Sequence, residues 1–422
     1  MKAEPEFSPV LEPCIVHVDI NSYFATLLQQ ENPALRNCPV GVIKSDGRSI
    51  LIAVSKEAKA RGVPSPCSAK EAKQLCPEIQ FVPVQFEFAW AMTVRLKELF
   101  ESFVPNVEIF SLDEAFLHLT DCKRLYPDPW KFGELVQQRI KEELGEWVTC
   151  NVGIGPNRFL AKVASGISPK GTIRQVTPDT IAELLTETTF KDTCGIGYRL
   201  GAKLENMGVT NPYQINFLPD EVLQKTFGPY FWKELRKMGQ GEEPALLQRI
   251  DHLPHMKSVG RSITGFDLTR DEDTIKKILF NLVEETCYKA RKMQLMGRYV
   301  AVYMRGGKGP DKRSWGQHAT LQHYINRSPD MFELIYHQMY KKWERDFPVI
   351  KFGVCLAMLK PAADINPQIW PQWERRQRLT VAADAMTQKY GLFTVRPGTL
   401  ARGKLLRPEV TGFMGDKKFL FG

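Results

Sequence analysis

The stretch VEIFSLDEAFLHLT, residues 107–120, carries two adjacent acidic residues where a strand pattern breaks. Its odd-numbered positions are apolar, as on one face of a strand, except at Ser111 and Asp113. Neighbouring residues of a regular strand point to opposite faces, so Asp113 and Glu114 can act together only where the chain turns. The break therefore predicts a hairpin whose tip carries both carboxylates.

A third carboxylate, Asp19, comes near the end of the alternating strand pattern CIVHVDI, residues 14–20. Grouped carboxylates repel one another and need cations to hold them together. Mg²⁺ is the natural cation, because it is commonly shared between a few carboxylates and substrate phosphates. Two such ions about 3.5–4 Å apart would activate a hydroxyl and stabilise a leaving pyrophosphate. From the residues alone, a solvent-exposed Asp-Glu turn without metal remains the alternative.

The elements that would position these acids alternate between strands and helices. A helix follows Asp19, with Asn21 or Ser22 as its cap and Phe24 in its buried stripe. Residues 36–80 predict a strand hairpin about Asp46-Gly47 and two short helices. Beyond them we expect a helix over 86–103, the acidic hairpin, a helix over 128–144, the strand TCNVGIG and a helix over 157–165.

Short helices with glycine breaks follow Gly171. The segment DTCGIGYRLGAKLENMGV predicts a helix, the turn Gly195-Ile196-Gly197 and a second helix. A helix-hairpin-helix of this kind offers backbone amides to a DNA phosphate without reading bases, although a purely structural helical turn has the same pattern. A linker then leads to strands near 260–268, 297–305 and 350–359 and helices near 271–293 and 328–345.

The length of 422 residues, with 43% apolar residues, suggests about three globular domains. The Pro-rich start lacks the pattern of a signal peptide, and no run of about 18 apolar residues offers a membrane span. We expect a cytoplasmic protein without membrane contact. Nine cysteines without a Cys-x-x-Cys pair indicate reduced packing residues rather than disulfides or a zinc module.

The net charge of +9 is unevenly distributed. Residues 258–361 hold 18 Lys and Arg against 11 Asp and Glu, and residues 362–422 hold 10 against 5, whereas residues 1–257 hold 29 against 32. A basic C-terminal third suggests a polyanionic partner such as nucleic acid. On charge alone, a merely soluble basic surface explains the count equally well.

Four motifs give the chain a family resemblance. VHVDINSYFA, AVSKEAKARGV, FSLDEAFLHLT and VGIGPNRFLAKVAS, in this order, resemble the motifs of the Y-family, lesion-bypass DNA polymerases of the DinB and UmuC type. The resemblance continues through the glycine turn and, more weakly, through KSVGRSITG and FGVCLAML, and it covers about residues 14–360.

The resemblance implies an α+β fold shaped as a right hand. It places a palm at 14–22 and 87–176, fingers at 23–86 and a thumb with the helix-hairpin-helix at 177–247. A linker at 248–257 would precede a little finger at 258–361, the basic segment found by counting. Residues 362–422 would form a C-terminal extension.

The resemblance also assigns roles to single residues. Asp19, Asp113, Glu114 and the carbonyl of Ile20 would hold two Mg²⁺ ions. Ser22 and Tyr23 would present amides to a deoxynucleoside triphosphate. Phe24 falls at the steric gate that excludes a ribose 2′-hydroxyl, with a core aromatic as the alternative. Ile52 would roof the new base pair or simply fill the core. DNA contacts would come from Gly195, Gly197, Lys203 and Arg261.

Two departures from the family pattern concern phosphate binding. Lys56 and Lys59 stand where DinB-type members have Tyr and Arg, and Glu-Ala-Lys is closer to the UmuC-like branch. Lysine neutralises phosphate as a point charge but lacks the bidentate geometry of arginine. The Lys-Pro that is usual in the family is Ser168-Pro169 here, so we assign the phosphate-binding lysine to Lys170, two positions on.

The activity implied is low-fidelity, template-directed DNA synthesis past damaged or undamaged template by a monomer, nucleoid-associated when active. Primer-template DNA and deoxynucleoside triphosphates would be its partners. Docking on a sliding clamp through Phe419–Phe421 is one reading of the C-terminus, and a tail packed on its own domain is the other. Alternatives for the whole chain are an inactive, polymerase-like DNA-binding adaptor, which would lack the acidic ligands, and a palm-fold nucleotidyl cyclase, which would need no basic domain.

Overall fold

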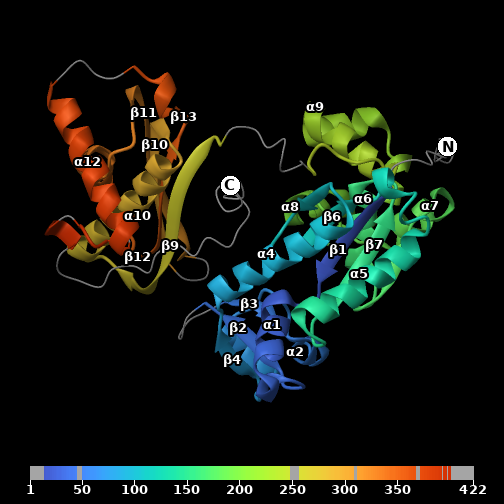
Figure 1. Cartoon of the computed structure of the whole chain (residues 1–422). Helices are drawn as coiled ribbons and strands as arrows, with labels where there is room; N and C mark the ends of the chain where they lie inside the picture. The colour runs from blue at the N-terminus through green and yellow to red at the C-terminus, as the bar shows by residue number, and fades with distance from the viewer. Residues whose placement is uncertain are drawn as a thin grey trace. The chain divides into compact units, whose positions relative to one another are not determined.

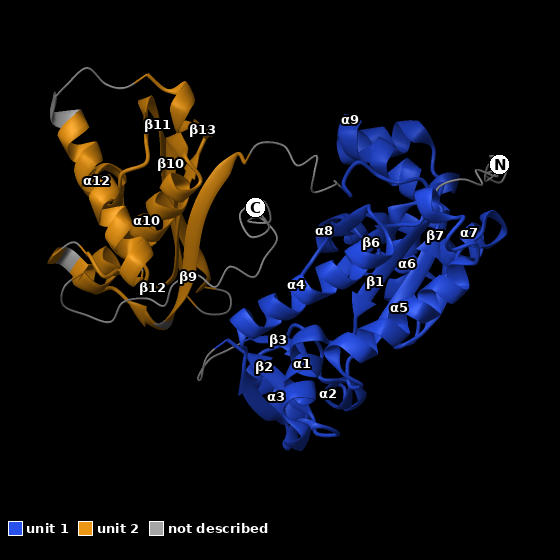
Figure 2. Ribbon diagram, in the orientation of Figure 1, with its two compact units in different colours: residues 1–252, 412–420 blue, residues 253–411, 421–422 orange. Residues whose placement is uncertain are grey.

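The computed structural model describes residues 14–44, 50–247, 256–307, 311–366, 371–391, 393–396 and 398–400. They form two compact units that divide near residue 252 (Figures 1 and 2). Each unit has a hydrophobic core of its own. Both combine sheets with helices, so the fold is α+β, as the sequence predicts. None of the helices in this described part is long and apolar enough to cross a membrane.

A five-stranded sheet organises the first unit, in the order β5-β6-β1-β7-β8. Its strands are β1 (Ile15–Ile20), β5 (Val107–Ile109), β6 (Glu114–His118), β7 (Cys150–Gly155) and β8 (Ile173–Gln175). The central strand β1 pairs antiparallel with both β6 and β7. Every residue of β7 is buried, since both faces of the sheet are covered here.

Three helices pack on this sheet at the positions that the sequence predicts. They are α4 (Phe86–Phe103), α5 (Pro129–Leu144) and α6 (Arg158–Ile167). Helix α6 packs against β1 and β7, and α5 packs against β7 and β8. Asn157 caps α6 by accepting a hydrogen bond from the Leu160 amide at 2.9 Å. Helix α6 therefore begins directly after the end of β7.

A three-stranded sheet in the same unit has the order β3-β2-β4. It contains β2 (Val40–Ile43), β3 (Leu51–Val54) and β4 (Gln80–Pro83), with helices α1 (Tyr23–Glu31), α2 (Lys56–Ala60) and α3 (Ala69–Leu75). Strands β2 and β3 pair antiparallel, as the hairpin prediction requires. The predicted turn at Asp46-Gly47 lies outside the described residues.

Helices α7 (Ile181–Glu187), α8 (Tyr198–Glu205) and α9 (Asp220–Gly239) complete the unit. The prediction of a helix directly before Gly195 is wrong, because residues 188–197 form turns and irregular structure. Threonine side chains cause this break: Thr189 Oγ1 donates to Asp192, and Thr193 Oγ1 donates to the Thr189 carbonyl. Such local bonds compete with helix formation. Gly195, with φ of +92°, then leads into α8.

The second unit is an antiparallel sheet in the order β11-β10-β12-β9 with α10 (Glu272–Lys292) on one face. Strands β9 (Ser258–Thr269), β10 (Leu295–Gly306) and β12 (Val349–Ala357) were predicted. The edge strand β11 (Arg313–Ile325) was not, since it is mostly exposed and gives little apolar alternation. The helix expected near 328–345 is broken into α11 (Ser328–Phe332), a π-helix (Glu333–Met339) and a 3-10 turn (Tyr340–Lys342).

The C-terminal extension packs on the second unit as far as Leu400. Arg291 of α10 forms a bidentate ion pair with Asp384 of α12 (Pro371–Tyr390), at 2.6 and 2.7 Å. Phe393 and Leu400 are buried in the core of this unit. The compact unit therefore continues beyond Pro361, where the sequence placed its end. The Phe419–Phe421 segment lies outside the described residues.

Candidate active site

The backbone brings the three predicted carboxylates to neighbouring strands. Asp19 of β1 stands opposite Glu114 of β6 in the antiparallel register. The Ile20 amide donates to the Asp113 carbonyl at 2.8 Å. The chain turns at residues 110–113 between β5 and β6, which confirms the hairpin predicted from the break in alternation.

Asp19 and Asp113 are buried carboxylates, and burial is the main influence on their pKa values. Burial raises the pKa of Asp19 to about 6; the Asp113 and Glu114 charges raise it too, while Lys170 opposes them. Burial likewise raises the pKa of Asp113, whose side chain accepts a hydrogen bond from Ser111. Both shifts mean that ionised carboxylates need a further cation here.

Glu114 differs from Asp19 and Asp113 because two side chains of the protein, Lys162 and His17, pair with its carboxylate. Lys162 of α6 forms an ion pair with its Oε2, and His17 Nε2 lies 3.2 Å from the same oxygen. His17 Nδ1 in turn lies 2.7 Å from Ser165 Oγ. Burial alone would raise the pKa of Glu114, but the His17 hydrogen bond and the Lys162 charge together lower it to about 2. Burial lowers the pKa of His17 to about 4.

The sequence analysis did not single out Lys162 or His17. Two signals were present in the printed chain. Lys162 interrupts the apolar run of RFLAKVAS, and His17 shares the alternating face of β1 with Asp19. Either pattern is common in structural helices and strands, so only the packing of α6 on β1 identifies them as neighbours of Glu114.

The donor chemistry of the three carboxylates fits a hard divalent cation. Carboxylate oxygens are its preferred ligands, and a cation would reverse the raised pKa values of Asp19 and Asp113. As the side chains stand, no group of three or more His, Cys, Asp or Glu in the described part of the chain surrounds a common metal position. The reason is visible in their contacts, since Glu114 faces Lys162 and Asp113 faces Ser111.

A cationic group lies beside these acids. Lys59 of α2 donates from Nζ to Ser22 Oγ at 2.9 Å. Burial and the neighbouring Lys170 charge lower the pKa of Lys59, while Asp19 raises it. Two lysines that repel each other next to free helix amides make a site that an anion would relieve. The structure therefore groups Lys59, Lys170, Ser22 and Asp19.

Ser22 has an unusual backbone conformation, with φ of 51° and ψ of 41°. A non-glycine residue in this left-handed region is uncommon and stores strain. The bend turns the chain from β1 directly into α1, whose first amides have no partner within the helix. Ser22 occupies the N-cap position, one of the two predicted, but its side chain makes no capping hydrogen bond and instead accepts one from Lys59.

Tyr23 and Phe24 are fixed by aromatic and polar contacts. The Tyr23 hydroxyl donates to the Ala89 carbonyl at 2.6 Å, so only its backbone can face a ligand. The half-buried Phe24 ring packs edge-on against Phe86, with ring centroids 5.7 Å apart. Ile52 is also half-buried on β3. Both Phe24 and Ile52 are therefore partly accessible from the surface and not sealed in the core.

Two residues that were predicted to bind DNA or nucleotide, Arg261 and Lys56, contact other side chains of the protein instead. Arg261, predicted to contact DNA, is buried and pairs with Glu285 of α10 at 2.6 Å, so its guanidinium is not presented at the surface of the unit. It shares its strand face with Val259, which directs it inward. The Lys56 ammonium lies over the ring of Trp147, 4.2 Å from its centroid, and does not join Lys59.

The glycine turn of the first unit is exposed at Gly195 and Gly197, and Lys203 of α8 is exposed as well. A side chain at Gly197 would meet open space, so close packing does not explain this glycine. The amides that begin α8 thus stand at the surface next to an exposed lysine. This is compatible with a phosphate contact.

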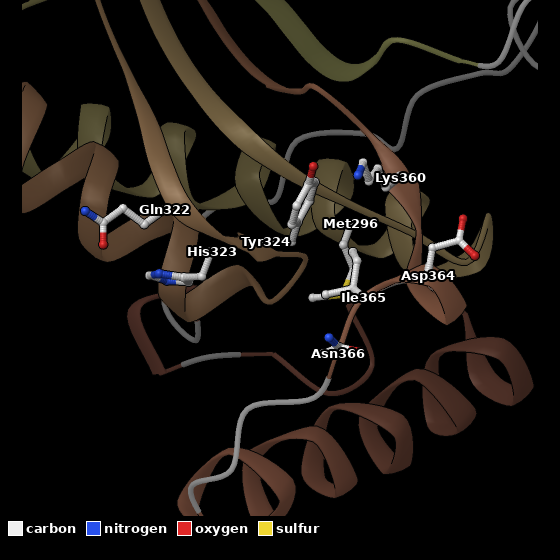
Figure 3. A pocket seen from close by; sticks show the side chains of 8 residues that line it. All are labelled: Met296, Gln322, His323, Tyr324, Lys360, Asp364, Ile365 and Asn366. Carbon is white, nitrogen blue, oxygen red and sulfur yellow. The ribbon is translucent and has the colours of Figure 1, made fainter.

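A pocket of about 300 Å³ lies in the second unit, at the ends of β11 and β13 (Lys360–Pro361) (Figure 3). Tyr324, Met296 and Lys360 are among the side chains that line it. It contains none of the predicted site residues, so it is separate from the acidic group of the first unit.

Comparison with known proteins defines the class. Residues 18–166 match the impB/mucB/samB family, and residues 256–369 match its C-terminal domain. DNA polymerase IV of Moorella thermoacetica is 30% identical over 380 residues, which cover 89% of this chain and 93% of that protein. DNA polymerase IV 2 of Bacillus subtilis is 26% identical over 90% of this chain and 92% of its own length.

A solved structure shows the same fold. The Y-family DNA polymerase chimera Dbh-Dpo4(243-245)-Dbh aligns with a TM-score of 0.68 and 23% identity, over 84% of this chain and all of that one. Fold and family models together define a DNA-directed DNA polymerase of the Y class. The chain belongs to the impB/mucB/samB family, the DinB- and UmuC-like members of that class. Such polymerases are metal-dependent nucleotidyltransferases.

Proposed function

We propose that this chain, acting as a monomer, extends a DNA primer opposite damaged or undamaged template with low fidelity. The observation that carries the proposal is one juxtaposition. Asp19 on β1 stands opposite Glu114 at the start of β6, Asp113 lies in the turn directly before it, and the cationic group of Lys59 and Lys170 lies next to Asp19. Carboxylates for metal ions beside cations for a triphosphate are what nucleotidyl transfer requires.

Asp19, Asp113, Glu114 and the Ile20 carbonyl would hold two Mg²⁺ ions. When bound, these ions would activate the primer 3′-hydroxyl and stabilise the leaving pyrophosphate. Lys162 and His17 support this arrangement by keeping Glu114 ionised and fixed in direction. The hydrogen bond from Ser111 fixes the direction of the Asp113 carboxylate, although burial still raises the pKa of Asp113.

The triphosphate would lie against the start of α1. The amides of Ser22 and Tyr23, with Lys59 and Lys170, would neutralise its charge. The edge-on contact with Phe86 holds the Phe24 ring in place, as a gate against the ribose 2′-hydroxyl requires. Ile52 would cover the new base pair.

DNA would be gripped by backbone contacts in both units. The glycine turn before α8 would hold one phosphate. In the second unit, the strand face opposite the core carries Tyr303, Arg305 and Lys351, whose neighbours on the same face are small or polar. We assign the five-stranded sheet to the palm, the three-stranded sheet to the fingers, helices α7–α9 to the thumb and the second unit to the little finger.

Primer extension with Mg²⁺ tests the proposal. The parent should extend a primer, and Asp113→Asn and Glu114→Gln should each reduce the rate at least a hundredfold while DNA binding in a gel-shift assay stays within about twofold. A matched control is Glu78→Gln, an exposed acid of the first unit, which should retain full activity. Extension that survives the Asp113 change would refute the metal assignment, and loss of DNA binding would show that the change is structural.

The inactive-adaptor alternative makes a different prediction for the same assay. An adaptor would bind primer-template DNA without extending it in the parent chain. The three carboxylates, with partners arranged around two of them, argue for the enzyme.

A further inference from the structure

Trp147, in the loop between α5 and β7, contacts the last turn of α1. Its backbone amide donates to Gln30 Oε1 at 2.9 Å, and its indole Nε1 donates to Gln29 Oε1 at 3.1 Å. Gln29 is buried, and Arg36 lies over the indole at 5.4 Å. Gly145 permits this approach, because a side chain there would overlap Gln30.

Helix α2 reaches the same indole by two routes. Lys56 places its ammonium 4.2 Å from the centroid of the ring. Glu57 accepts from Gln29 Nε2 at 3.1 Å, and Gln29 bonds the indole in turn. The first turn of α2 is thereby tied to the α5–β7 loop, while Lys59, on the same short helix, donates to Ser22.

We infer that Lys56 is a positioning residue: its contact with Trp147 fastens α2 so that Lys59 stands at the triphosphate. Lys56 does not itself bind phosphate. The inference rests on the proposed function in taking Lys59 as the phosphate ligand. It gives Lys56 a role other than the one suggested by its place in the family motif.

Two physical arguments support a positioning role for Lys56 and a phosphate-binding role for Lys59. A cation is attracted to the face of an indole, and the contact needs no nucleotide, so it organises the site before the substrate arrives. Lys59, in contrast, lies next to Lys170, and the charge of Asp19 offsets this repulsion only in part. The two lysines of one helix therefore differ: Lys56 has its aromatic partner in the free protein, and Lys59 gains a further counter-charge when the triphosphate binds.

The test compares single and double substitutions in the full chain. Lys56→Gln and Trp147→Leu should each raise the KM for the incoming nucleotide about twofold to fivefold, the range expected for an exposed cation–π contact, with kcat nearly unchanged. The double variant should be no worse than the worse single one, because both remove the same contact. Lys56→Arg keeps the cation over the indole and should stay near the parent.

Thermal unfolding without nucleotide gives a readout independent of activity. Lys56→Gln should lower the midpoint and should have no further effect once Trp147→Leu is present. Lys59→Gln should not lower the midpoint but should raise the nucleotide KM at least tenfold. Lys70→Gln, which removes an exposed lysine of α3, controls for the loss of charge alone and should change neither value.

Multiplying effects of Lys56→Gln and Trp147→Leu on KM would overturn the inference, as would an unchanged midpoint for Lys56→Gln. Either result would favour the alternative, in which Lys56 binds the triphosphate directly. A parent chain that cannot extend a primer would instead overturn the proposed function. The unfolding midpoints would still decide whether the Lys56 contact exists.

Discussion

Asp19 and Glu114 face each other across two strands, yet their environments have opposite effects on their charge. Burial raises the pKa of Asp19 to about 6, whereas His17 and Lys162 overcome the effect of burial and lower that of Glu114 to about 2. Glu114 is therefore neutralised by the protein, and Asp19 is left for an external cation. This asymmetry can be measured without assaying activity.

The substitution Asp19→Asn should stabilise the metal-free protein at pH 8 by about 1–3 kcal/mol. The folded chain holds the Asp19 proton more tightly than the unfolded chain, whose carboxyl has the ordinary value of 3.8. Stability linked to this proton is complete below about pH 4 and lost as the pH rises through 6. The gain from Asp19→Asn should therefore vanish near pH 4, as measured by denaturant unfolding in EDTA.

Glu114→Gln is the matched control, because its sign is opposite. The lowered pKa of Glu114 means that its charge stabilises the fold above about pH 4.5, so removal of that charge should destabilise the protein at pH 8. Saturating Mg²⁺ should remove the advantage of Asp19→Asn by neutralising the parent carboxylate. A destabilising Asp19→Asn at pH 8 would contradict the burial of an unpaired charge.

At the scale of elements, the site depends on how closely α6 approaches the sheet. Lys162 and Ser165 reach Glu114 and His17 only because α6 packs directly on β1 and β7. Gly153 of β7 allows this, since a side chain there would lie 1.9 Å from the Ala161 carbonyl oxygen. Arg158, at the start of α6, is held by Glu108 and Glu243, which fixes this end of the helix.

Gly153→Ala should lower the free energy of unfolding by more than about 3 kcal/mol, because backbone must move to admit the methyl group. Gly166→Ala is the control, in the helix α6 that packs on β7: the position is exposed and has open space, and alanine favours helix by up to about 1 kcal/mol. Chemical denaturation of both variants checks this. Equal stabilities would contradict the close approach of α6 and β7.

The sequence predicted these elements well where periodicity was strong and poorly where it was not. Helices α4, α5 and α6 lie within a few residues of their expected limits. The helix predicted before Gly195 does not form, because Thr189, Asp192 and Thr193 make local side-chain hydrogen bonds instead. Strand β11 was missed because an exposed edge strand has little apolar alternation to detect.

For the whole molecule, charge is divided between the two units. The first 257 residues are nearly neutral, and the basic excess lies in residues 258–422. Much of the strand face opposite the core of the second unit is free of large apolar side chains and presents Arg305 and Lys351. We therefore expect the second unit to supply most of the salt-sensitive DNA affinity.

A chain ending at Lys257 should show a shallower dependence of DNA affinity on salt than the full chain. Each lost phosphate contact should reduce the slope of log K against log salt by about 0.9. Arg305→Gln with Lys351→Gln should reduce it by about 1–2 in the full chain. Fluorescence anisotropy between about 50 and 200 mM salt measures these slopes. Equal slopes for the truncated and full chains would refute the assignment.

The sequence by itself determined the broken strand at Asp113 and Glu114, the main helices of the first unit, the uneven charge and the family motifs, because these are local patterns or sums. Only the tertiary structure decided which side chains meet. Lys162 is 48 positions from its partner Glu114 in the sequence, and His17 is 97 positions from Glu114. Arg261 turns inward to Glu285. Lys56 lies on Trp147, far along the chain. Such contacts depend on which faces of strands and helices pack together, and no local pattern encodes that choice.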